Sequence, residues 1–339
     1  MIILIPLAKI AIAISILLFV VTYLVYFERK ISAWIQDRIG PNRVGPAGLL
    51  QSPADVLKLF FKEDIVPQAA TKFIHSLAPV ISLTIAMSTY AVIPFGPEIS
   101  LFGYKVKLIV ADVDIGILFI LAFTSIGVYG LTLSGWGSNN KYSLLGGLRS
   151  SAQMISYELS MGLSVIGVLL ISGSLRIYDI INHQQGWMWN AFIQPIGFIT
   201  FVVSAFAETN RLPFDLPEAE PELVGGYHTE YSSLKFAMFF LAEYANMIIA
   251  SCLIAALYLG GWHIPFINSS SLSEGWLPLI SVFIYLLKVC LILFFFIWVR
   301  WSIPRFRYDQ LMNLGWKVMF PLSLVNIAWV TILVYFFKI

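Results

Sequence analysis

Eight long runs of apolar residues limit the fold of this chain more than any other feature of its sequence. Each approaches the 20 or so residues that a helix needs to cross the hydrocarbon core of a bilayer. Of the 339 residues, 59% are hydrophobic and only 12% charged, whereas soluble domains carry about 25% charged residues. Because so few charged residues cannot cover a water-facing surface, we expect the lipid bilayer to surround most of this chain. The runs lie at about 4–27, 73–93, 115–133, 152–171, 191–207, 234–259, 277–299 and 318–337.

The continuity of these runs predicts an all-α integral membrane protein, a bundle of about eight transmembrane helices in one polytopic domain over residues 1–339. A membrane β-barrel would alternate apolar and polar residues instead. The first run, Leu4–Phe27, is too long for the apolar part of a signal peptide, and charged residues follow it. We therefore expect it to be a first span. The run at 191–207 has the shortest apolar core.

Composition also limits the kinds of site that the chain can carry. The net charge of +2 argues against nucleic-acid binding. Two cysteines, Cys252 and Cys290, are too few for an iron–sulfur cluster and form no CxxC pair. The four histidines lie in four different segments without the spacing of a metal or haem site. A site assembled from distant segments stays open, but we expect no metal and no redox cofactor bound by this chain.

Lysine and arginine gather in alternate loops. The loop after the first run holds seven of them, whereas all the even-numbered loops together hold only Lys105, Lys107 and Arg176. Because positively charged loops stay on the cytoplasmic side, we expect the odd loops to face the cytoplasm or matrix. Both termini should then face the opposite side.

The first loop contains a predicted interfacial helix at about 53–62. A Ser-Pro-Ala-Asp start supplies a cap and a first turn. Apolar side chains share one side of this helix, and Asp55, Lys58 and Lys62 share another. Gly-Pro steps before it predict a stiff turn. Taken alone, the segment is also consistent with a simple surface anchor.

Several charged residues fall where charge is costly. Glu158, Glu243 and Lys288 lie in the fourth, sixth and seventh runs, and Glu208 closes the fifth. A charge at mid-bilayer costs at least about 2.5–3.5 kcal/mol, so it usually has a partner or a function. At 1.5 Å per residue, Glu158 lies about 10 Å and Glu243 about 13 Å from the inner surface. Two interpretations stay open: a hydrated proton path, or a buried ion pair, such as Lys288 with one glutamate, that fixes helix packing.

The fifth loop, 208–233, is acidic and unusually rich in proline. Its three prolines recur every four residues and prevent a regular helix. Glu218, Glu220 and Glu222 alternate, so an extended chain would place them on one face. An acidic loop can simply be solvated. Its leucine, phenylalanine and tyrosine residues favour the alternative, a folded loop over a cavity.

Motifs in these loops resemble one known family. Phe27–Lys30 followed by Arg38–Pro46 resembles the first loop of membrane subunit 1 of respiratory complex I and of its bacterial counterpart. The run Glu208–Tyr231 resembles that family's central signature. The resemblance covers about residues 1–337, and the two long motifs are very specific. Shorter matching segments are Ser134–Trp136, Tyr142–Gly146, Ile155–Glu158 and Arg305–Leu311.

The resemblance implies a quinone-chamber and energy-coupling subunit of a proton-pumping NADH:quinone oxidoreductase, not catalytic alone. Partner subunits of the peripheral arm would carry FMN and iron–sulfur clusters, and the quinone (ubiquinone or menaquinone) would be the substrate. The first span, the interfacial helix and the sixth span would form a lipid-side entrance. Small membrane subunits and antiporter-like subunits would be further partners. The wording of 220–230 favours a bacterial plasma membrane over a mitochondrial inner membrane.

The resemblance and the chemistry of the loops together give the candidate site residues. Those of the quinone chamber and its entrance are Arg29, Arg38, Arg43, Asp55, Lys58, Lys62, Phe214, Glu218, Tyr227, His228 and Tyr231. Those of the proton path and its coupling are Glu158, Glu208, Arg211, Asp215, Glu220, Glu222, Glu230, Glu243 and Lys288.

One position departs from part of the family. Some bacterial members carry a glutamate in the third span, where this chain has Ser125. Mitochondrial members also lack that acid. A proton path through this chain must therefore use a hydroxyl or water at that point.

The sequence leaves two alternative functions. A homologous subunit of a ferredoxin-dependent dehydrogenase or a membrane-bound hydrogenase would have a similar membrane chain, and its electron-input partners would distinguish it. A stand-alone ion-coupled transporter should show an internal repeat and paired broken helices. We find no such pattern in the sequence.

Overall fold

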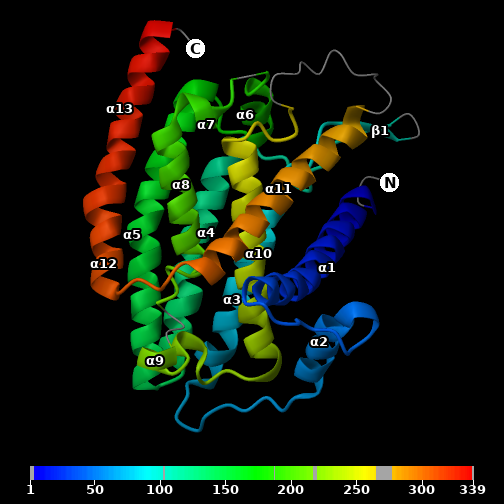
Figure 1. The fold of residues 1–339 in the computed structure, drawn as a ribbon, viewed down its shortest axis with the longest axis vertical. Helices are drawn as coiled ribbons and strands as arrows, with labels where there is room; N and C mark the ends of the chain where they lie inside the picture. The colour runs from blue at the N-terminus through cyan, green and yellow to red at the C-terminus, as the bar shows by residue number, and fades with distance from the viewer. Residues whose placement is uncertain (1–3, 102–103, 187, 217–219, 265–276, 338–339) are drawn as a thin grey trace.

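The computed structural model describes residues 4–101, 104–186, 188–216, 220–264 and 277–337. These residues form an α-helical bundle with the loops at its two ends (Figure 1). Seven helical segments are long and apolar enough to cross a membrane. They are α1 (Leu4–Ile35), α3 (Lys72–Tyr90), α4 (Gly116–Gly137), α5 (Lys141–Ser172), α10 (Ser233–Leu257), α11 (Leu277–Ser302) and the run of α12 (Tyr308–Asn313), η4 (Leu314–Met319) and α13 (Phe320–Phe337).

The expected span at 191–207 differs from the others because it is broken. It consists of α7 (Asn190–Ile193) and α8 (Pro195–Glu208), with non-helical backbone at Gln194 between them. At 1.5 Å per residue, the 14 residues of α8 cover only about 21 Å. The count of long apolar spans among the described residues is therefore seven, with α8 as a shorter eighth helix, where the sequence predicted about eight full spans.

Polar side chains of α13 form hydrogen bonds with the backbone groups at this break. Asn326 of α13 accepts a hydrogen bond from the Gly197 N–H at 2.9 Å and donates one to the Gln194 side chain at 3.2 Å. Trp329 donates to the Ile193 carbonyl. Backbone groups inside a bilayer must find partners within the protein, and α13 supplies them for the first turn of α8.

The π-helical segment η4 joins α12 to α13. Pro321, just after it, has no N–H to donate to the carbonyl one turn earlier. The Phe320 N–H instead reaches back five residues to the Gly315 carbonyl. The chain thus passes the proline without a kink that would end the helix.

Helix α10 stands in the middle of the bundle (Figure 1) and is its most buried span. Small residues such as Ala245, Ala255 and Ala256 allow its neighbours to approach closely. Its C-terminal carbonyls lie inside the protein and are satisfied by side chains: Gln184 donates to Ala256 and Asn190 to Leu257. This helix therefore contributes a large share of the protein's core, to which α1, α4, α5, α8 and α11 also contribute.

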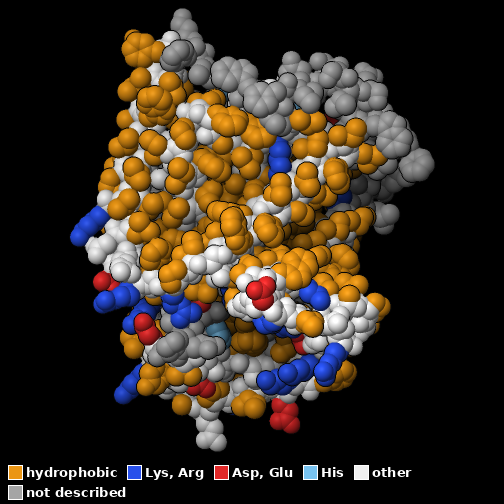
Figure 2. All heavy atoms as spheres, in the orientation of Figure 1, with side chains coloured by type: hydrophobic (Ala, Val, Ile, Leu, Met, Phe, Trp, Pro, Cys, Tyr) orange, Lys and Arg blue, Asp and Glu red, His pale blue; other side chains and the backbone are white. Residues whose placement is uncertain are grey.

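The loops at one end carry most of the charge. In Figure 2 the hydrophobic side chains form a broad belt, and most visible Lys, Arg, Asp and Glu side chains gather below it. This end contains η1 (Pro46–Gly48), α2 (Gln51–Phe61), α9 (Glu220–Leu223) and η2 (Gly226–His228). The helix predicted at 53–62 is thus present as α2. We call this the inner end.

The opposite end, here the outer end, has a feature that the sequence did not indicate. A two-stranded antiparallel hairpin, β1 (Ile99–Leu101) and β2 (Tyr104–Val106), lies in this half of the protein, as does the short helix α6 (Ile177–His183) (Figure 1). Asp112 joins the two loops because it pairs with both Lys107 and Arg176. Hydrogen bonding to Arg176, together with Lys107, lowers the pKa of the Asp112 carboxyl to about 2.

Candidate functional site

A buried cluster of opposite charges joins four elements at the inner end of the membrane region. Glu28 of α1 contacts Arg300 of α11 and lies 3.2 Å from an Arg211 nitrogen in the fifth loop. Arg211 Nε lies 2.8 Å from a Glu243 oxygen in α10. Both Glu28 and Arg211 are at most 5% exposed. Two arginines balance two glutamates, so the cluster is neutral overall, which is the condition under which buried charges are tolerated.

Tyr244 completes this charge cluster. Its hydroxyl donates to Glu28 at 2.7 Å, and its ring lies 4.2 Å from the Arg211 guanidinium carbon. Glu28, Tyr244 and Arg300 were not among the predicted site residues. A signal for Glu28 existed, because an acid at the end of an apolar run needs a partner, and Glu28 belongs to the recognised first-loop motif. Nothing in the local sequence singled out Tyr244.

A polar cavity leads from the cluster into the bundle. Its lining includes Glu243, Asn246, Glu208, Thr209 and Thr124. Its water-accessible volume is about 40 Å³. A water needs about 10–15 Å³ on this measure and two to four polar partners. The cavity therefore has both the room and the chemistry for two or three waters between Glu243 and Glu208.

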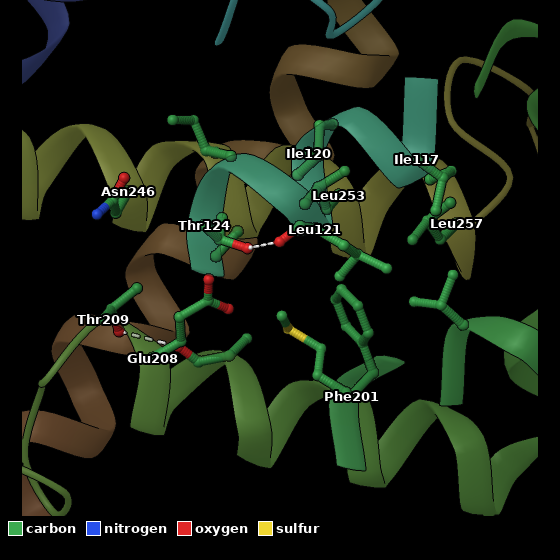
Figure 3. Close-up of a pocket in the computed structure, with 15 residues that line it drawn as sticks. Ile117, Ile120, Leu121, Thr124, Phe201, Glu208, Thr209, Asn246, Leu253 and Leu257 are labelled. Carbon is green, nitrogen blue, oxygen red and sulfur yellow. Dashed lines mark hydrogen bonds between the residues drawn. The ribbon is translucent and has the colours of Figure 1, made fainter. Parts of the chain in front are cut away.

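Two neighbouring hydroxyls on α4 continue this line of polar groups. The Glu208 carboxylate points toward Thr124 in Figure 3. The next residue, Ser125, donates a hydrogen bond to the Glu158 carboxylate of α5. The hydroxyl of Ser125, which the sequence singled out in the third span, is thus bonded to a carboxylate. Glu243, Glu208 and Glu158, which the sequence placed at similar depth, lie in one connected region.

The described part of the acidic loop is folded, which decides between the two interpretations of its composition. Phe214 and Leu216 are buried. The buried Gln153 of α5 donates to the carbonyls of Ala207 and Phe214, both at 2.7 Å. Arg305 pairs with Asp215 at 2.9 Å. One amide side chain thus fixes the turn that carries Arg211.

The second half of the loop packs on the inner extension of α5. Glu222 pairs with Arg149 at 2.6 Å, and Glu230 accepts a hydrogen bond from Asn140 at 2.5 Å. These two acids therefore lie in ion pairs and hydrogen bonds at the inner surface, apart from the Glu243–Glu208–Glu158 line. Glu218 lies outside the described residues, and the side chain of Glu220 is likewise outside the description.

Aromatic side chains of this loop contact the ends of the membrane helices. Tyr231 stacks on the fully buried His75 of α3 at 4.0 Å between ring centroids, and the His75 ring is hydrogen-bonded to the Glu230 carbonyl. Tyr227 contacts Phe239, and His228 contacts Phe236 and Phe240. These predicted chamber residues are therefore close to α10 and α3.

The predicted residues of the first loop lie on and around α2. Arg29 pairs with Asp55 at 2.6 Å, which fastens α2 to the end of α1. Arg38, Arg43, Lys58 and Lys62 are exposed at the inner surface. The structure places them on the surface beside the charge cluster and does not bring them into it.

Lys288 lies in α11, the span where the sequence placed it, but its partners are carbonyl groups. Its ammonium donates to the carbonyls of Leu259, Gly261 and His263, at 2.6–2.9 Å, and lies 4.3 Å from the Trp189 ring centroid. Leu259 is 16 residues beyond Glu243, about 24 Å along a helix. The proposed ion pair between Lys288 and a glutamate is therefore wrong. A cation at the end of a helix satisfies its last carbonyls and interacts favourably with its dipole.

The described residues contain no group of three or more His, Cys, Asp or Glu side chains arranged to hold a metal ion. The fold and the site together define a polytopic membrane protein in which a neutral charge cluster at one surface connects to carboxylates inside the bundle.

Comparison with known proteins identifies the family. Residues 8–331 match the NADH dehydrogenase family. The chain is 56% identical over 324 residues to NADH-quinone oxidoreductase subunit 8 of Rhodothermus marinus, covering 93% of this chain and 92% of the relative. It is 52% identical over 332 residues to a subunit of the NADH-quinone oxidoreductase of Geobacter metallireducens, covering 97% of each. The chain therefore belongs to the NADH dehydrogenase family, as a membrane subunit of a complex I-type enzyme that is not catalytic alone.

Proposed function

We propose that the inner end of this subunit forms part of a quinone chamber, and that the line Glu243, Glu208, Glu158 carries the effect of quinone reduction to protons. The observation that carries the proposal is the continuity of this line: charge cluster, polar cavity, and the hydroxyls of Thr124 and Ser125. Glu243 and Glu208 line the same cavity, and carboxylates that share a site repel each other when both are ionised, so the protonation of each depends on the other.

The charge cluster is the input of this relay. Reduction of a quinone consumes protons and leaves negative charge nearby until they arrive. Arg211 contacts both Glu28 and Glu243, so a new negative charge near the loop competes with these carboxylates for one guanidinium. Weaker pairing of Glu243 with Arg211 favours proton uptake by Glu243. The loop that holds Arg211 is fastened by Gln153 and by the ion pair of Asp215 with Arg305, which favours transmission of the shift to Glu243.

The chamber in this proposal is walled by the first and fifth loops. Its entrance lies where α2 meets α1 and α10, because α2 packs on both helices and exposes large apolar side chains such as Leu57, Phe60 and Phe61. An apolar quinone tail can follow such a surface from the lipid. Ubiquinone and menaquinone both have this chemistry.

The rest of the enzyme supplies the electrons. In this proposal, peripheral-arm subunits carry electrons from NADH through FMN and iron–sulfur clusters to the quinone, and small and antiporter-like membrane subunits move protons beside this chain. The inner end faces the bacterial cytoplasm. The relatives' names as NADH-quinone oxidoreductase subunits support this assignment over a ferredoxin-dependent dehydrogenase or hydrogenase.

The test of the relay is Glu243→Gln in the assembled complex. The amide keeps the shape of the side chain but cannot titrate. A positioned group that transfers a proton speeds a reaction about 10²–10⁴-fold. Because water in the cavity can replace part of this effect, we expect the rates of quinone-linked turnover and proton pumping to fall at least about tenfold. Oxidation of NADH by a water-soluble artificial acceptor should stay unchanged.

Glu98→Gln is the matched control, because Glu98 is exposed at the outer end. It should leave all three activities as in the wild type. Normal pumping by both Glu243→Gln and Glu208→Gln in reconstituted vesicles would refute the relay and leave these acids a structural role.

A further inference from the structure

A second, apolar cavity lies on the other side of Glu208. Figure 3 shows its lining, which four helices contribute. Leu121 comes from α4, Val165 from α5, Phe201 from α8 and Leu253 from α10. The cavity continues toward the outer end as far as Leu257. From Asn246 to Leu257 is 11 residues of α10, or about 16 Å, which is about half of the hydrocarbon core.

The two cavities meet at a shared set of polar groups, Thr124, Glu208, Thr209 and Asn246. On the inner side of this set, the lining of the polar cavity also holds Ser82, Asn210 and Glu243. On the outer side, the lining of the apolar cavity is entirely aliphatic, aromatic or methionine. Glu208 therefore stands at a boundary between polar and apolar surroundings.

Size does not keep water out of the apolar cavity, but its chemistry does. Its water-accessible volume is about 30 Å³, which is enough for about two waters. A buried water needs two to four polar partners, and cavities lined by Leu, Ile and Phe stay dry. Proton transfer over this length needs a chain of waters or titratable groups, and the outer part of the lining offers neither.

We propose that this apolar cavity is a dry seal, which prevents a proton on Glu208 from leaving toward the outer surface through this chain. The proton can then move back toward Glu243 through the polar cavity or onward, past Thr124 and Ser125, to Glu158. This inference rests on the proposed relay and adds the direction of proton movement. The residues that set this direction are apolar and do not themselves carry protons. Leu121, Val165 and Leu253 act by excluding water.

The test places a polar group in the middle of the seal. Leu253→Asn keeps the number and branching of the side-chain heavy atoms and gives water a donor and an acceptor. Liposomes with the assembled complex are given a pH gradient without NADH, and the decay of the gradient is followed with a trapped pH dye. We expect Leu253→Asn to speed the decay severalfold and to lower the protons pumped per NADH. Adding Glu208→Gln to Leu253→Asn should restore the slow decay, because the leak begins at Glu208.

Leu253→Met is the matched control, because it keeps the lining apolar at similar volume, and its gradient should decay as in the wild type. Val165→Thr is the second variant, and its near-identical shape protects folding if Leu253→Asn does not assemble. Slow decay in every polar variant that assembles would overturn the seal, as would a leak that persists with Glu208→Gln. The relay is refuted by a separate result, which is normal pumping by both single variants, Glu243→Gln and Glu208→Gln.

Discussion

At the scale of single residues, Lys9 and Lys288 show how a lysine in a membrane helix can be stabilised without an acidic partner. Lys9 of α1 donates to the Lys107 and Ile109 carbonyls, and Lys288 of α11 donates to three carbonyls beyond α10. Carbonyl oxygens at chain ends need donors, and an ammonium supplies three. The carboxylates are thereby left to the arginines and hydroxyls of the inner half.

His263 is affected by this arrangement and makes stability depend on pH. Burial, and then the charge of Lys288, lower the pKa of His263 to about 4. A histidine that stays neutral when folded but titrates near 6.5 when unfolded loses folded-state stability as the pH falls from about 6.5 toward 4. We expect a loss of about 1–2 kcal/mol at pH 5, after allowance for partial exposure.

Thermal unfolding of the detergent-solubilised complex at pH 7 and pH 5 measures this loss. His263→Gln should reduce the difference between the two pH values, whereas His183→Gln, at an exposed position, should leave it as in the wild type. An equal pH dependence in His263→Gln and the wild type would show that His263 does not titrate in this range.

At the scale of elements, two serines hold the interfacial helix α2 against α10. Ser233 donates to the Lys62 carbonyl at 2.8 Å and to the Leu59 carbonyl at 3.1 Å. Ser232 accepts from the Ile65 N–H at 2.9 Å. These bonds satisfy backbone groups at the C-terminal end of α2. The two serines that make them directly follow Tyr231. The proposed entrance and the folded acidic loop are thus joined at one point.

Removing both hydroxyls should loosen α2. In Ser232→Ala with Ser233→Ala, hydrogen bonds worth about 1 kcal/mol each are lost, so we expect the KM for a short-tailed quinone to rise about fivefold or more. NADH oxidation by an artificial acceptor should not change. Ser15→Ala is the control, because that hydroxyl bonds only within α1. An unchanged KM in the double variant would separate α2 from quinone entry.

At the scale of the whole molecule, the broken span decides the topology. Seven long helices alone would put the two termini on opposite sides of the membrane. With α8 as an eighth crossing, α1 begins and α13 ends toward the same end of the bundle (Figure 1), opposite the basic loops in Figure 2. From the positive-inside rule, we propose that the basic end faces the cytoplasm.

Single cysteines test this orientation. In a background with Cys252→Ala and Cys290→Ala, Gln185→Cys at the outer end and Lys141→Cys at the inner end are both exposed positions. A membrane-impermeant maleimide added to intact spheroplasts should label Gln185→Cys, and should label Lys141→Cys only after lysis. The reverse pattern would invert the topology.

The sequence by itself determined the class of fold, because scarce charges and long apolar runs leave a helical bundle in a bilayer as the stable solution. It also indicated that Glu158, Glu208 and Glu243 lie at similar depth, since depth follows from the number of residues to the span end. It indicated that the run at 191–207 has a short apolar core, but we did not predict the break at Gln194, although the residue before a proline is biased away from the helical region.

Only the tertiary structure decided which groups meet. Glu28, Arg211, Tyr244 and Arg300 come from four distant segments, and pairing between helices depends on rotation and tilt, which local sequence does not encode. One interpretation of the sequence paired Lys288 with an acid. Its ammonium instead donates to carbonyls of the chain just beyond α10. The dry cavity beside Glu208 likewise exists only where four apolar helix surfaces fail to close completely.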